Sequence, residues 1–195
     1  MTQTNMSSAR KAMINSQLRT SGINEEYVLS RMNSVAREEF VPDAVKPLAY
    51  MDRAIPLGEG RFLPSPVVHG MMLTEAAPGP DDTVLIVENG SSYLAELVQP
   101  LVASVDTISA QDAAGKSRGG STYSLVLIDG AVEELSNTVK KRMDDGGRIV
   151  TGVVTRGVTR LASGKKIAGT VSLRPIAEIG IPVLDMFTKP ESWSF

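Results

Sequence analysis

Hydrophobic and polar positions change their spacing near residue 80. Before it, apolar residues recur at helical intervals, which predicts helices over residues 9–20, 24–34, 44–50 and 67–76. The stretch 55–66 is rich in proline and glycine and predicts an ordered loop. After it, short apolar runs alternate with helix-like segments, which predicts strands over residues 83–87, 104–108, 123–128 and 148–154. We therefore expect an N-terminal helical appendage with a substrate-side loop, residues 1–80, on an α/β core, residues 81–195, in one compact unit.

Strand–helix alternation of this kind is typical of a mainly parallel, doubly wound sheet with right-handed crossovers. Helices are expected over 93–102 and 132–143, and the broken β-like run 159–181 predicts a terminal hairpin. The aromatic end of the chain, with Trp193, is expected to dock on the body. Only the glycine-rich segment 110–122 follows the second strand, and it is too short for both a crossover helix and another strand.

Composition narrows the class of protein without specifying a reaction. The 195 residues are 42% hydrophobic and 22% charged, with a formal net charge of −2. These values are those of an ordinary soluble domain, so we expect a cytoplasmic protein that binds neither nucleic acid nor membranes. The chain has no cysteine, and its one histidine, His69, is expected to be a helix or loop residue without a catalytic role. No metal site is predicted.

The junction at residues 84–93 is the main candidate for binding a small molecule. The apolar run Val84-Leu85-Ile86-Val87 leads into the polar cluster Glu88-Asn89-Gly90-Ser91-Ser92, and a helix-like segment starts at Tyr93. At such junctions in α/β proteins, free backbone N–H groups and a helix N-terminus face the ligand. Asp129 follows the third strand and is expected at the same edge of the sheet.

Phrases along nearly the whole chain carry a family resemblance. They are Gln17-Leu18-Arg19, Arg37-Glu38-Glu39-Phe40-Val41-Pro42, Ala49-Tyr50-Met51-Asp52, Ile55-Pro56-Leu57-Gly58, the 84–93 junction and Gly146-Gly147-Arg148-Ile149-Val150. In this order they resemble the protein-L-isoaspartate O-methyltransferase family. The resemblance implies a Rossmann-like fold and transfer of a methyl group from S-adenosylmethionine (SAM) to the side carboxylate of an isoaspartyl residue. That carboxylate is already ionised at pH 7, so the family's enzymes mainly have to position it.

The cofactor-binding residues that the resemblance implies depart from the family pattern. With Tyr93 aligned to the family's Gly-Tyr, residues Glu88, Gly90 and Ser92 take the three glycine positions, and a bulky anion replaces the first glycine. A register shifted by two residues instead makes Glu88 the acid of the strand and Gly90 the first glycine. The ribose-binding acid corresponds to Ser109, for which Asp106 and Asp112 are possible substitutes. Asp129 completes the family-equivalent region.

The substrate-side loop and the sheet also depart from the family pattern. The family's Ser-x-Pro aligns with Pro64-Ser65-Pro66, which puts Pro64 in the place of the serine. Ser65, one residue displaced, is therefore the one candidate for a catalytic hydroxyl. Because segment 110–122 is short, the sheet is expected to lack one strand–helix unit. The strand at 104–108 would then be an edge, which suggests a homodimer.

These departures favour a non-catalytic descendant that keeps the fold, uses no cofactor and binds a protein or peptide partner. An active SAM-dependent carboxyl methyltransferase that repairs isoaspartyl residues is the alternative. A binder of a small molecule other than SAM is a further alternative.

Overall fold

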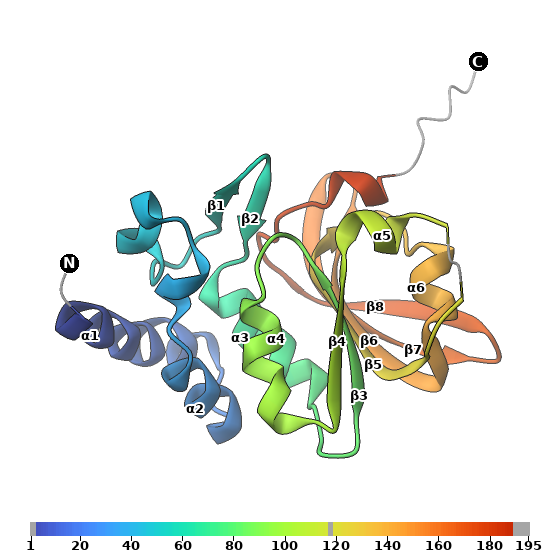
Figure 1. Ribbon diagram of the computed structural model, residues 1–195, viewed down its shortest axis with the longest axis horizontal. Coiled ribbons are helices and arrows are strands. Elements are labelled where there is room, and N and C mark those ends of the chain that lie inside the picture. Colours follow the sequence, from blue (N-terminus) through green and yellow to red (C-terminus); the bar gives the residue numbers. More distant parts are fainter. Residues whose placement is uncertain (1–2, 117–118, 189–195) are drawn as a thin grey trace.

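The computed structural model describes residues 3–116 and 119–188, so Trp193 lies outside the described residues. Figure 1 shows α1 and α2 at one end of the molecule and the large sheet at the other, with α3 and α4 between them. No helix in the described ranges is long and apolar enough to cross a membrane.

The N-terminal part is helical, as predicted. Its α-helices are α1 Gln3–Met13, α2 Glu26–Ser34 and α3 Pro66–Ala76, joined by the short π and 3-10 turns η1 Ile14–Leu18, η2 Arg19–Ser21, η3 Arg37–Phe40 and η4 Asp43–Leu48. The loop predicted at 55–66 was wrong, because β1 Ile55–Gly58 and β2 Arg61–Leu63 pair there as an antiparallel hairpin. Gly58 and Gly60 adopt φ values of 96° and 73°, so these glycines form the turn of the hairpin.

The large sheet has the order β4-β3-β5-β6-β7-β8. Its strands are β3 Thr83–Glu88, β4 Ser104–Ser109, β5 Tyr123–Val132, β6 Met143–Thr155, β7 Val158–Ile167 and β8 Thr170–Glu178. The first four are parallel, and β7 and β8 form the predicted terminal hairpin. The predicted α/β sheet is confirmed, with the second predicted strand, β4, at one edge. A homodimer through this edge stays a prediction.

Short helices connect the strands. They are α4 Tyr93–Val98 with η5 Gln99–Leu101, α5 Ala110–Ala114, α6 Asn137–Lys141 and η6 Asp185–Phe187. The helix predicted over 132–143 was wrong in its extent, because β5 continues through Asp129 and Gly130 to Val132. Helix α6 begins only after Ser136, whose hydroxyl accepts a hydrogen bond from the backbone of Val139 at 3.1 Å.

Alternate residues of the parallel strands face two apolar clusters. Val84 and Ile86 pack with α3, α4 and the N-terminal helices, whereas Leu85 and Val87 pack with α5 and α6. Leu125 and Leu127 of β5 belong to the first cluster, so the following odd-numbered residue, Asp129, faces the N-terminal part. The alternation therefore decides which strand-end side chains meet α3.

Two polar clusters tie the N-terminal part together and to the sheet. In the first, Arg10 of α1 donates to the Tyr50 hydroxyl at 2.6 Å and pairs with Glu38 at 3.1 Å, and the Tyr50 hydroxyl also donates to Glu38. The second centres on Asp82, just before β3. Its carboxylate accepts from Arg148 of β6 and from the Ser124 hydroxyl of β5, both at 2.7 Å.

Candidate functional site

The carboxyl ends of β4, β3 and β5 bring three of the predicted site residues into one row. Ser109 pairs in register with Glu88, and Val87 pairs with Ile128, so Glu88 and Asp129 follow as neighbours on adjacent strands. The Glu88 and Asp129 side chains leave the sheet on the face that carries α3 and α4, since they continue the alternation of Ile86 and Leu127, whereas the Ser109 hydroxyl caps α5. The structure thus assembles the predicted row, and the chemistry of each member can be considered separately.

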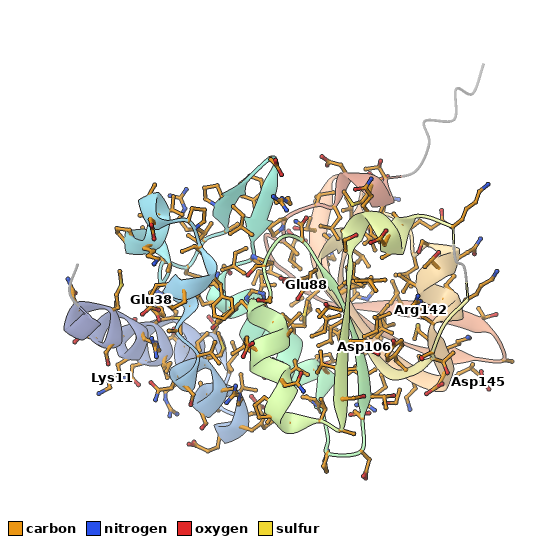
Figure 2. The ribbon with its side chains drawn as sticks, viewed as in Figure 1. Lys11, Glu38, Glu88, Asp106, Arg142 and Asp145 are labelled. Carbon is orange, nitrogen blue, oxygen red and sulfur yellow. The ribbon has the colours of Figure 1, made fainter. Side chains whose placement is uncertain are left out.

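Glu88 is the member whose surroundings are least favourable for its charge. It lies in the middle of the molecule, at the end of β3 (Figure 2). Its Oε1 atom is buried without a hydrogen-bond partner among the described residues. Burial raises the pKa of Glu88, and the nearby charge of Asp129 raises it further.

The turn after Glu88 lies beside Arg61 of the β1–β2 hairpin. Gly90 has φ 89°, a conformation that favours glycine. A Cβ atom built on Gly90 would lie 3.0 Å from Cδ and 3.1 Å from Nη1 of Arg61, so the Arg61 side chain rests against this turn. Ser92 is exposed, and its side chain does not cap α4. The backbone that a cofactor would approach therefore carries an arginine from the same chain.

Ser109 has its hydroxyl engaged within the chain. It accepts from the Asp112 backbone N–H at 3.0 Å, which caps α5, and donates to the Asp112 carboxylate at 2.7 Å. The Asp106 carboxylate accepts the Tyr123 hydroxyl proton at 2.8 Å. Both possible substitutes for a ribose-binding acid are thus already hydrogen-bonded to neighbouring side chains.

Asp129 ends a buried polar chain that the sequence did not reveal. The His69 imidazole, which is fully buried on α3, lies between Asp129 and Arg37 of η3. Its Nε2 is 2.8 Å from Asp129 Oδ1, and its Nδ1 is 3.1 Å from Arg37 Nη1. The prediction that His69 lies on a helix or loop is confirmed, but its charged partners are 32 and 60 residues away along the chain.

The hydrogen-bond partners of His69 determine which of its ring nitrogens carries the proton. Arginine only donates, so His69 Nδ1 must accept and its proton must be on Nε2, which donates to Asp129. Burial lowers the pKa of His69, and Asp129 only partly opposes this effect. His69 is therefore a neutral bridge between a buried cation and a buried anion.

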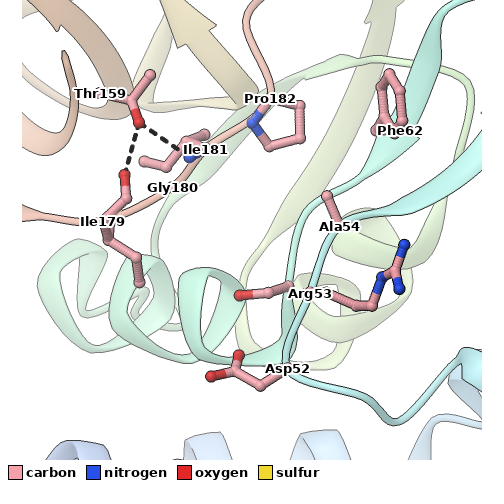
Figure 3. A pocket seen from close by; sticks show the side chains of 10 residues that line it. Asp52, Arg53, Ala54, Phe62, Thr159, Ile179, Gly180, Ile181 and Pro182 are labelled. Atoms are coloured by element: carbon pink, nitrogen blue, oxygen red, sulfur yellow. Dashed lines mark hydrogen bonds between the residues drawn. The ribbon is translucent and has the colours of Figure 1, made fainter.

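The structure also contains a cleft of about 600 Å³ (Figure 3). Three segments line it, which are Asp52–Ala54, the pair Phe62 and Ser65, and the strand-end segment Ile179–Pro182 with Thr159. Thr159 fixes the third segment, since its hydroxyl donates to Ile179 O at 2.7 Å and accepts from Ile181 N at 3.1 Å. We call this cavity the cleft.

Ser65, the candidate catalytic hydroxyl, lines the cleft and is nearly buried. It is also the N-cap of α3, where its Oγ accepts from Val68 N at 3.5 Å. The structure thus places Ser65 beside the cleft, whereas Glu88, Ser109 and Asp129 lie at the strand ends. Among the described residues, no group of three acidic or histidine side chains could hold a metal ion.

A mainly parallel α/β sheet with its candidate residues at the carboxyl strand ends defines the Rossmann-like class. Residues 8–114 match the family model described as protein-L-isoaspartate(D-aspartate) O-methyltransferase. A protein-L-isoaspartate O-methyltransferase of Koribacter versatilis is 32% identical over 82% of this chain and 83% of that protein. A protein-L-isoaspartate O-methyltransferase of Herpetosiphon aurantiacus is 30% identical over 74% of this chain and 75% of that protein. The chain belongs to the protein-L-isoaspartate(D-aspartate) O-methyltransferase family, as its motifs suggested.

Solved structures confirm the fold. A protein-L-isoaspartate O-methyltransferase of Plasmodium falciparum, in complex with S-adenosyl-L-homocysteine, matches with a TM-score of 0.71 and 12% identity. The match covers 91% of this chain and 98% of that one. The predicted Rossmann-like methyltransferase fold is therefore correct.

Proposed function

We propose that this chain is a family member that binds a peptide segment of a protein in the cleft and does not transfer a methyl group. The observation that carries the proposal is Glu88. Its carboxylate has a buried oxygen that no described residue contacts by a hydrogen bond, at the position where a cofactor-binding turn needs backbone without side chains.

Two further features of the strand ends argue against a SAM site. Arg61, which is paired with Glu59 at 2.7 Å, packs against Gly90 and occupies the space beside the turn that a cofactor would approach. Ser109 offers a single hydroxyl that is already bound to Asp112, where two ribose hydroxyls would need a carboxylate. The residues present do not fit the cofactor, so we assign no step to it.

The cleft has the properties of a peptide site. Its lining combines the aromatic ring of Phe62, the charged side chains of Asp52 and Arg53, and the backbone segment Ile179–Pro182. Met51 and Val183, two more exposed apolar side chains, immediately adjoin lining residues in the chain. Apolar side chains beside backbone and charged groups suit a short extended peptide.

One observation favours the alternative, an active carboxyl methyltransferase. Ser65 faces the same cleft, so a hydroxyl is available near a peptide bound there. Calorimetric titration with SAM and with S-adenosylhomocysteine distinguishes the non-catalytic peptide binder from the active methyltransferase. We expect no binding of either compound at millimolar concentration, and micromolar binding would favour the active methyltransferase instead.

Peptide binding needs a separate measurement. We expect a fluorescein-labelled heptapeptide with a central isoaspartyl residue, or its aspartyl counterpart, to bind with an affinity that Phe62→Ala weakens. The matched control is Ile167→Ala, which removes an exposed apolar side chain from β7, outside the cleft lining. Equal losses in the two variants, or no binding of either peptide to the wild type, would refute the proposed site. Methyl transfer to the isoaspartyl peptide would refute the non-catalytic assignment.

A further inference from the structure

The buried residues Arg37, His69 and Asp129 lie close to backbone groups that adjoin the segments lining the cleft. Arg37 Nε donates to the carbonyl of Ala49 at 2.8 Å, three residues before the first lining segment, Asp52–Ala54. Its Nη2 donates to the carbonyl of Pro64, which directly precedes the lining residue Ser65. The Arg37 side chain thus hydrogen-bonds to backbone near two of the three lining segments, Asp52–Ala54 and the pair Phe62 and Ser65.

Asp129, the other end of this set of buried residues, belongs to the strand that pairs with the third lining segment. Asp129 lies in β5 two residues before Ala131, whose N–H donates to Pro182 O at 2.8 Å. Ala131 O accepts from Leu184 N, also at 2.8 Å, so the segment that ends in Pro182 pairs directly with β5. His69 bonds to both Arg37 and Asp129, and so connects the N-terminal part with strand β5.

The contacts of Arg37 leave it little freedom to move independently. Its side chain is fully buried, and the guanidinium carbon lies 5.0 Å from the centre of the Tyr93 ring. Its charge is balanced inside the protein by Asp129 through the neutral imidazole. Loss of Arg37 or Asp129 would leave the opposite buried charge without compensation, which is strongly unfavourable.

We propose that Arg37 and His69 are positioning residues of the cleft, and that protonation of His69 opens it. This proposal rests on the proposed function of the cleft as a peptide site. A proton on His69 Nδ1 would face the Arg37 guanidinium, donor against donor and cation against cation. Arg37 must then move away, and the carbonyls of Ala49 and Pro64 lose their donor.

The groups that face His69 act on its protonation in opposite directions. They are Arg37 from η3, Asp129 from β5 and Tyr93 from α4, whose ring centre is 5.3 Å from that of the imidazole. Glu88 of β3 is close enough to Asp129 for the Asp129 charge to raise the pKa of Glu88. Asp129 favours the protonated imidazole, but burial and Arg37 oppose it, so the closed cleft belongs to the neutral form.

A test on the wild type needs no peptide. His69 is the only histidine of the chain, so ¹⁵N-histidine labelling gives the NMR signals of one imidazole. At pH 7 we expect a neutral ring with its proton on Nε2. On acidification, the backbone amides of Ser65 and Gly180 should shift with the same midpoint as the ring. A charged ring at pH 7, a proton on Nδ1, or cleft amides that do not follow the titration would overturn the proposal.

A variant tests the consequence for binding. Glutamine at position 69 offers an acceptor and a donor but does not titrate. Below the His69 midpoint, wild-type affinity for the labelled isoaspartyl heptapeptide should fall by about tenfold per pH unit. His69→Gln should bind at pH 7 and lack this pH dependence, whereas Val139→Ala, a core change on α6, should keep it. An identical pH dependence in His69→Gln would overturn the proposal. If the peptide does not bind the wild type at pH 7, the proposed function fails, and the NMR test still decides whether His69 positions the cleft walls.

Discussion

Replacing Glu88 by glutamine should stabilise this protein at neutral pH. The substitution removes a charge whose Oε1 is buried without a partner, beside Asp129. The amide has nearly the same shape as the carboxylate but carries no charge. A conservative change at a family motif position should therefore increase the free energy of unfolding.

The magnitude follows from the surroundings of the side chain. A buried polar atom without a partner costs about 1–3 kcal/mol. The Glu88 residue is only partly buried, so solvent screening reduces this to about 1 kcal/mol. For a chain of this size, that corresponds to a rise in Tm of about 2–4 °C.

The effect should depend on pH in a defined direction. In the folded protein the pKa of Glu88 lies above its usual value of 4.5. The stability associated with the protonated carboxyl is present below about pH 4.5 and is lost as the pH rises through the folded pKa. The advantage of Glu88→Gln should therefore be small at pH 4 and full at pH 7.

Thermal unfolding followed by circular dichroism at pH 4, 5.5 and 7 checks this prediction. The matched control is Glu96→Gln, which makes the same change of charge on the exposed side of α4. A lower Tm for Glu88→Gln at pH 7, or the same gain at pH 4 as at pH 7, would refute our reasoning about Glu88.

Three further changes test other parts of the structure by chemical denaturation. Asp82→Asn should lower the free energy of unfolding by about 1–2 kcal/mol at pH 7. Burial raises the pKa of Asp82, but hydrogen bonds from Arg148 and Ser124 outweigh it and lower that pKa below 3.8, so the loss should shrink as the pH falls through the folded pKa. Gly130→Ala should destabilise by about 1–3 kcal/mol, since the new Cβ would lie 2.6 Å from Leu184, and adding Leu184→Ala should restore part of the loss. Tyr50→Phe should cost about 1–3 kcal/mol, because it removes the hydroxyl between Arg10 and Glu38; no loss would show that their direct ion pair suffices.

The sequence predicted the parts of the fold that depend on local pattern. Strand alternation gave the parallel core, and the register of parallel strands made it possible to expect Glu88, Ser109 and Asp129 at one edge. The extent of β5 could not be read in this way. Its last residues are held in extended form by pairing with β6 and with Val183, which are contacts distant in sequence.

The buried chain shows where sequence pattern stops being informative. A single histidine within an apolar helix gives no sign of an arginine 32 residues before it and an aspartate 60 residues after it. An arginine is also expected at the surface, so nothing marks Arg37 as fully buried. Only the packing of η3, α3 and β5 against one another brings the three together.

The third wall of the cleft has a consequence for synthesis of the protein. Ile179–Pro182 follows β8 near the end of the described chain, whereas the other two walls are complete by Ser65. During translation the parallel strands can therefore pair before the cleft exists. A nascent chain that stalls after β6 would carry the four parallel strands but not the third wall, so the peptide site that we propose would still be incomplete.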